Sequence, residues 1–175
     1  MRKRILRAVL LLLLGALLPG PAVSWAKAKK STPEVRAKAV RLTRELEGDP
    51  LAVDAVDKRR WLIDWFTKAP DISILVCDLL GPLPKDDHPF FPQVLAQSMF
   101  AGGVFIIEHP DQAGDQVAVQ SAGIEGALKV YEIFVKAMPE GRLPFLDDLL
   151  AKRGDGTLHD HMKEAVGKSC TSDKG

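Results

Sequence analysis

The sequence is poor in several residue types that often reveal a function. It contains no asparagine and only two cysteines in 175 residues. Without asparagine there is no acceptor site for N-glycosylation. The two cysteines, Cys77 and Cys170, are far apart, so the chain lacks the Cys-x-x-Cys pair of thioredoxin-like redox motifs and of c-type haem attachment.

Sequence signatures of common enzymes are also missing. The chain has no Gly-x-Ser-x-Gly nucleophile elbow, no His-Glu-x-x-His zinc motif and no glycine-rich phosphate loop. It also has no face of spaced lysines and arginines of the kind that binds a nucleic-acid backbone. We therefore predict no catalytic residues, no cofactor, no bound metal and no nucleic-acid partner. A hydrolase whose active-site residues lie far apart in the sequence stays open as an alternative.

The N-terminal segment has the three parts of a secretory signal peptide. Residues 1–7 carry four basic side chains, and residues 8–18 form an apolar run of eleven residues. Small residues then follow at the spacing that a signal peptidase recognises, in Ser24-Trp25-Ala26 or in Ala26-Lys27-Ala28. The run is too short for a permanent anchor, since a membrane-spanning helix needs about 20 apolar residues. We expect cleavage after Ala26 or Ala28, export to the periplasm or the medium, and no stable membrane insertion afterwards.

The chain that remains after cleavage is expected to form one domain. Removal of the signal peptide, residues 1–26, would leave 20 basic and 23 acidic side chains, a slightly acidic and ordinary protein surface. Residues 27–31 are expected to be a basic, disordered N-terminus. Residues 32–167 form the expected single helical domain, and residues 168–175 form a polar C-terminal tail.

An even pair of cysteines in an exported protein predicts a disulfide between Cys77 and Cys170. The two residues lie 93 positions apart, and closing a loop of that length stabilises a fold by about 4–5 kcal/mol at most. The bond would hold the C-terminal tail on the domain, although such tails normally fray. A buried Cys77 with a free, exposed Cys170 is the alternative.

Apolar residues recur with helical spacing along most of the chain after residue 31. The segment 94–107 is uncharged and is expected to be a buried central helix, in which Ala101, Gly102 and Gly103 allow a neighbouring helix to approach closely. The pattern predicts an all-α domain, an irregular array of six or seven helices around this central one. The expected helices other than the central one cover residues 32–48, 49–69, 71–80, 111–138 or 115–138, 143–153 and 157–166.

Several helix ends and ion pairs follow from local patterns. Thr32 and Pro33 are expected to begin the first helix, and the Asp49-Pro50 pair is expected to begin the second in the same way. Gly154 is expected to end the helix that begins near residue 143. Spacing of four residues predicts three ion pairs within helices, namely Arg60–Asp64, Glu125–Lys129 and Glu132–Lys136.

The segment 71–80 has an ambiguous pattern. Ile72, Ile74 and Val76 alternate as in a strand, whereas Leu75, Leu79 and Leu80 fit one face of a helix. A single strand would have no partner in this chain. We therefore predict a short helix.

Two groups of residues are candidates for an interaction surface. Trp61 and Trp65 share one helix, and core packing is the competing explanation for them. His88, Phe90 and Phe91 lie in a proline-rich loop over residues 81–92, and loops often carry function.

Two short motifs contain residue types that bind metals, and one tripeptide matches an adhesion motif. On a helix, the imidazoles of His159 and His161 point about 200° apart, which disfavours a shared metal ion. The segment Asp86-Asp87-His88 is better explained as a solvated turn than as a cation site. The tripeptide Arg153-Gly154-Asp155, which resembles an integrin-binding motif, is better explained by a helix end.

These observations favour a small exported helical protein that binds a protein partner in the cell envelope, such as an inhibitor or immunity-type module. A carrier of a small molecule or a metal, with its ligand near Trp61 and Trp65 or near His159 and His161, is the alternative. An unrecognised hydrolase is the third reading, and a polar pocket where acidic side chains and histidine converge would favour it.

Overall fold

The structure is a computed structural model that describes residues 30–82, 84 and 88–170. The predicted signal peptide lies outside these residues. Within them, all regular secondary structure is helical, which confirms the predicted all-α fold. The elements are α1 (Pro33–Gly48), α2 (Ala55–Lys68), α3 (Phe91–Glu108), α4 (Gln116–Ala137), the short 3-10 helix η1 (Pro139–Gly141), α5 (Pro144–Asp155) and α6 (Leu158–Ser169).

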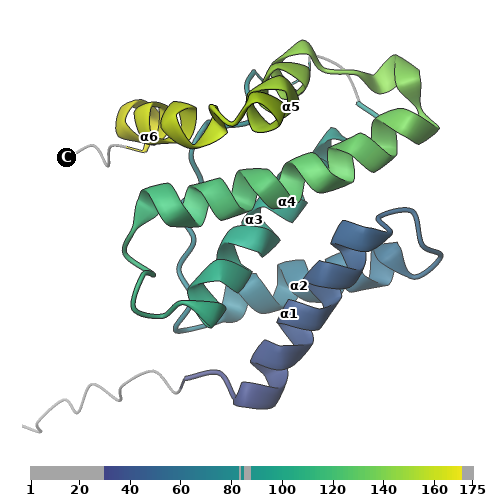
Figure 1. Ribbon diagram of the computed structural model, residues 1–175. Helices are drawn as coiled ribbons and strands as arrows, with labels where there is room; N and C mark the ends of the chain where they lie inside the picture. Colours follow the sequence, from purple (N-terminus) through teal and green to yellow (C-terminus); the bar gives the residue numbers. More distant parts are fainter. Residues whose placement is uncertain (1–29, 83, 85–87, 171–175) are drawn as a thin grey trace, which may run out of the picture.

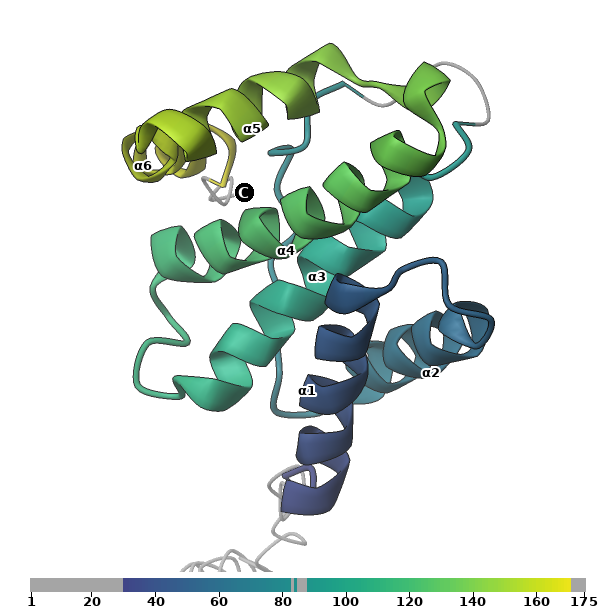
Figure 2. The ribbon, with the colours of Figure 1, turned by 45° about the vertical axis from the view of Figure 1, so that its right-hand side comes forward.

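The helices form three layers. The α3–α4 hairpin lies in the middle, with α1 and α2 on one side and α5 and α6 on the other (Figures 1 and 2). One apolar core lies between α1, α2 and the hairpin, and a second lies between the hairpin, α5 and α6. The predicted central helix is confirmed as α3, which contributes side chains to both cores.

Capping side chains explain where two of the helices begin. Thr32 Oγ1 accepts a hydrogen bond of 3.4 Å from the Val35 N–H at the start of α1, as predicted. Asp115 accepts one of 3.0 Å from the Ala118 N–H, so α4 begins after this residue and not after residue 111. Both bonds satisfy amide groups that have no partner within the first turn of a helix.

The predicted start of the second helix at Asp49-Pro50 is wrong. Asp49 instead accepts a hydrogen bond of 3.1 Å from the Leu51 N–H, two residues further on. This local bond stabilises a turn rather than a helix start. The chain continues through turns, and α2 begins only at Ala55.

The predicted short helix over residues 71–80 is also wrong. The structure shows neither a helix nor a strand there, and the segment runs along α3 and α4 from one core to the other (Figure 2). Ile72 packs in the core beside α1 and α2, whereas Leu79 and Leu80 pack in the core beside α5 and α6. Ten extended residues span about 33 Å and ten helical residues only about 15 Å, so the extended form can reach both cores.

The C-terminal helices end later than expected. Gly154 lies inside α5, and the residue that ends this helix is Gly156, with a φ of 82° in the left-handed region that glycine adopts without strain. Helix α6 continues to Ser169, so its last two residues belong to the predicted tail. Residues 171–175 of that tail lie outside the described residues.

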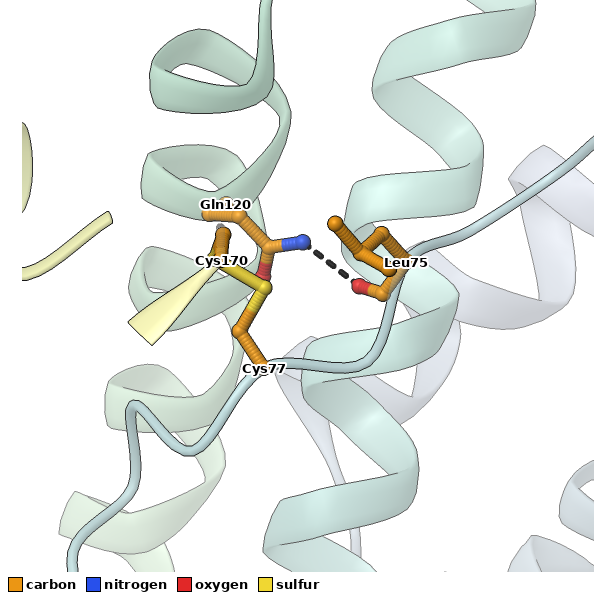
Figure 3. The surroundings of a disulfide bond; sticks show 4 residues. All are labelled: Leu75, Cys77, Gln120 and Cys170. Atoms are coloured by element: carbon orange, nitrogen blue, oxygen red, sulfur yellow. Dashed lines mark hydrogen bonds between the residues drawn. A yellow bond between two sulfur atoms is a disulfide. The ribbon is translucent and has the colours of Figure 1, made fainter. Parts of the chain in front are cut away.

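The predicted disulfide is present in the structure and joins two distant parts of the chain. Cys77 lies in the segment between α2 and α3, and Cys170 directly follows α6 (Figure 3). Beside the bond, the Gln120 side chain of α4 donates a hydrogen bond of 2.6 Å to the Leu75 carbonyl. The segment 71–80 is therefore held to α4 and to the end of α6.

None of the three predicted ion pairs forms. Arg60 pairs with Asp57 at 2.7 Å instead of with Asp64. The other two fail because their members meet partners from different helices, since Lys129 pairs with Glu47 of α1, and Glu132 pairs with Arg153 of α5. Local pairs on a helix are worth only a few tenths of a kcal/mol, roughly 0.2–0.5, so tertiary partners readily replace them.

Candidate functional site

The predicted tryptophan pair on α2 lies between helices. Trp61 and Trp65 stack with their ring centres 6.0 Å apart and are both half-buried against the core beside α1. The Lys38 ammonium of α1 lies 4.2 Å from the centre of the Trp61 ring, a cation–π contact. These contacts attach α2 to α1, as the packing explanation predicted.

The loop residues of the candidate surface lie elsewhere in the molecule, in contact with the second core. Phe90 and Phe91 have exposed fractions of 0% and 5%, so they are core residues and not part of an exposed surface, contrary to the prediction. His88 packs edge-on against Phe90 and binds the start of α3, since its Nδ1 accepts a hydrogen bond of 3.1 Å from the Phe91 N–H. The other nitrogen, Nε2, therefore carries the proton and donates to the Gly141 carbonyl at 3.0 Å.

The structure points instead to the outer face of α2. Val56 and Ile63, seven residues apart on one side of the helix, are 62% and 51% exposed. They line a groove of about 540 Å³, and Gln93 of α3 is also part of its lining. Four of the six large apolar residues that are exposed in the described part of the chain lie on α2 or in the turn before it: Leu51, Val53, Val56 and Ile63.

Arg59 lines the same groove and differs from its basic neighbours. Its guanidinium is half-buried and donates a hydrogen bond to the Pro50 carbonyl in the turn before α2. Burial lowers the pKa of Arg59 from its usual value, and no carboxylate of the described residues offsets this effect. Arg60 and Lys68, by contrast, pair with Asp57 and Asp64. Within the described residues, no ion pair includes Arg59.

A second candidate is a charged cleft between α1, α3 and α4, with a volume of about 180 Å³. At its base lies the carboxylate of Glu47, whose side chain is only 7% exposed. Arg44 and Lys129 donate to this carboxylate at 3.1 and 2.9 Å, and Arg44 also reaches Glu108 at 3.1 Å. His109 and Glu125 complete the charged or polar part of the lining.

The cleft presents both signs of charge, which suits a small polar molecule better than an apolar one. Its described lining contains no serine, threonine or cysteine that would act as a nucleophile. The most buried carboxylate is already bonded to two cations, as expected of an ion network that joins helices. Acidic groups and a histidine do converge here, which is the feature that would favour an enzyme. The cleft therefore remains the second candidate site, after the outer face of α2.

The remaining predicted motifs have ordinary surroundings. His159 is exposed and His161 is half-buried beside Glu164 and Lys168, on the surface of α6. Within the described residues, no group of three or more potential ligands is placed to hold a metal ion. Arg153 of the Arg-Gly-Asp tripeptide is engaged by Glu132, and residues 86–87 lie outside the described part.

Sequence reasoning missed both the α2 groove and the charged cleft. Val56 and Ile63 have the spacing of a buried helical stripe, and only the packing of Leu62 and Phe66 shows that another face of α2 is buried. The cleft gathers charges from three helices, and none of their spacings in the sequence indicates a site.

No helix among the described residues has the length and apolar character that crossing a membrane requires. Comparisons with protein families, curated proteins and solved structures find no match to this chain. Its function is therefore inferred from its own geometry.

Proposed function

We propose that this chain is an exported, non-enzymatic helical protein that binds a protein partner through the outer face of α2. The observation that carries the proposal is the groove lined by Val56 and Ile63, with Leu51 and Val53 exposed in the turn before it. Gathered, exposed aliphatic side chains are costly in water and typically mark an interaction site. An inhibitor or immunity-type protein for an effector that acts in the cell envelope is one concrete form of this function.

Two features support the proposal of export. The first is the signal-peptide pattern of residues 1–26. The second is the Cys77–Cys170 disulfide, because such bonds persist mainly in oxidising compartments such as the periplasm and the extracellular medium.

The proposal is tested by native mass spectrometry of the protein purified from its natural host. The test variant carries Val56→Glu and Ile63→Glu, which place two charges in the groove. The matched control carries Leu75→Glu and Val76→Glu, since these residues are similarly exposed, at 41% and 61%, but lie outside α2. We expect one partner chain to remain bound at fixed stoichiometry to the wild type and to the control, and to be lost from the α2 variant.

Circular dichroism of all three proteins checks that they are folded, because exposed substitutions normally change stability only slightly. The proposal fails if the α2 variant keeps the partner. It also fails if the wild type carries no partner chain under conditions that preserve other envelope complexes of the host.

The charged cleft supports one alternative function, the binding of a small polar molecule. Lys129 has donors to spare beside Glu47, and Glu108 and Glu125 offer acceptors on the same cleft. The same mass measurement tests this alternative, which requires a small additional mass on the wild type that disappears in Lys129→Met.

A further inference from the structure

We infer that the segment of the partner that fills the α2 groove is amphipathic and carries a carboxylate for Arg59. This inference rests on the proposed function, because it names the chemistry of the partner at that face. Among the basic side chains of α2, Arg59 alone has no carboxylate partner within the described residues.

The other basic residues of α2 all have carboxylate partners. Lys58 pairs with Glu45 at 3.0 Å and with Asp54 at 2.9 Å, and Arg60 pairs with Asp57. Lys68 pairs with Asp64 one turn before it. Arg59, which is more buried than Arg60, has only the Pro50 carbonyl as an acceptor within the described residues. Most of its five N–H donors are therefore available to a ligand.

Arg59 lines the groove beside Val56 and Ile63, and the charged side chains of Arg60, Asp64 and Lys68 line it as well. Arg59 follows Val56 by three residues and precedes Ile63 by four, so the three side chains share one face of α2. A partner that covers the two aliphatic side chains must also cover the guanidinium. An amphipathic helix with an acidic residue beside its apolar stripe has this arrangement of groups.

Covering the groove changes the energetics of Arg59. The Arg59 side chain is only half-buried, so water reaches part of it, and a bound partner would remove that water. A buried cation without a counter-charge is strongly unfavourable, whereas a carboxylate that accepts two parallel hydrogen bonds compensates for the lost hydration. A purely apolar or basic segment would therefore be rejected, and an acidic one would be selected.

The probe for the test is a phage-displayed library of random 16-residue peptides, selected on the disulfide-bonded protein. The selected peptides are synthesised, and their dissociation constants are measured for the wild type, Arg59→Gln and Val56→Glu/Ile63→Glu. Arg60→Gln is the matched control, because it removes a neighbouring arginine that already has an internal partner. Thermal unfolding of each variant shows whether the contact of Arg59 with Pro50 matters for folding.

We expect peptides whose binding depends on Val56 and Ile63 to contain Asp or Glu beside aliphatic residues. Arg59→Gln should weaken their binding at least tenfold, and Arg60→Gln less than threefold. Replacing the acidic residue of the peptide by its amide should weaken binding to the wild type at least tenfold and have little further effect on Arg59→Gln. This non-additivity identifies a direct pair, which a purely structural role of Arg59 would not produce.

Two other results are distinguishable. If peptides bind the α2 face without an acidic residue, or bind Arg59→Gln as well as the wild type, the inference about Arg59 is overturned while the docking face stands. If no selected peptide loses affinity in Val56→Glu/Ile63→Glu, the proposed docking face itself is overturned. Should Arg59→Gln unfold, the acid-to-amide change in the peptide still decides the question on the wild type.

Discussion

At the scale of single residues, Asp71 shows how one carboxylate fixes the start of the fold. It lies 40 residues beyond Ser31 and accepts hydrogen bonds from the Ser31 hydroxyl at 3.0 Å and from the Ser31 N–H at 3.2 Å. Arg36 of α1 also pairs with it. Burial alone would raise the pKa of Asp71, but the hydrogen bonds from Arg36 and Ser31 outweigh it and hold the pKa below its usual value.

A lowered pKa in the folded state makes stability depend on pH in a definite direction. Free Asp titrates near pH 3.9, so the stabilisation by Asp71 is complete above about pH 4 and is lost as the pH falls through the lower pKa of the folded state. Asp71→Asn should therefore lower the free energy of unfolding by about 1 kcal/mol at pH 7 and flatten its decline below pH 4.

Urea unfolding between pH 2 and pH 7 measures both effects. Asp111→Asn is a suitable control, because Asp111 is exposed, lies outside the helices and takes part in no ion pair among the described residues. Its pH profile should follow that of the wild type. An Asp71→Asn profile that runs parallel to the wild type would show that this carboxylate does not contribute to acid sensitivity.

At the scale of elements, glycines determine how closely α3 and α4 approach. A Cβ atom added at Gly123 of α4 would lie 2.8 Å from the backbone oxygen of Ser98 on α3. One added at Gly102 of α3 would lie 3.4 Å from the backbone oxygen of Val119 on α4. Backbone atoms cannot move aside as a flexible side chain can, so these two positions hold the hairpin in close contact.

Gly123→Ala should therefore destabilise the protein although alanine favours helices. The gain in helix propensity is about 1 kcal/mol, but overpacking against a fixed carbonyl costs about 1–3 kcal/mol and displaces the two helices. Chemical denaturation should give a net loss of stability.

Gly167→Ala is the matched control on α6, since nothing lies within 4 Å of the added Cβ atom. It should stabilise the protein by up to about 1 kcal/mol, because propensity acts there without a clash. Equal effects of the two substitutions would contradict the close approach of α3 and α4.

At the scale of the whole molecule, the segment 71–80 and the disulfide connect two cores that share only the α3–α4 hairpin. Ile72 packs in one core and Leu79 in the other, and Cys77 between them is bonded to the end of α6. The C-terminal helix is thus attached to the segment that leads into α3. Unfolding of either core should therefore destabilise the other.

Removal of the disulfide should weaken this connection without changing the helices. Replacing both cysteines by serine restores the entropy of a loop of 93 residues to the unfolded chain. We expect the free energy of unfolding to fall by about 2–4 kcal/mol while the far-ultraviolet circular dichroism at 20 °C stays that of the wild type.

Adding a reductant to the wild type should reproduce the loss, and adding it to the double variant should change nothing. A wild type that is equally stable with and without reductant would show that the covalent bond has no thermodynamic effect.

The sequence by itself determined the disulfide and the position of most helices. Helix positions depend on apolar periodicity and on capping residues close in sequence, so α1, α3 and α4 were predictable from segments around Thr32, residues 94–107 and Asp115. The pairing of Cys77 with Cys170 followed because no other cysteine is present.

Only the tertiary structure decided which face of each element is exposed and which charged groups meet. Residues 71–80 are extended because their apolar side chains pack in two distant cores. Lys129 pairs with Glu47 and not with Glu125, because α1 places a buried carboxylate beside it. The α2 face is open because no other element of the described residues covers Val56 and Ile63. Local preferences are worth a few tenths of a kcal/mol, whereas burial of a side chain is worth about 1.5–3 kcal/mol, so packing prevails wherever the two disagree.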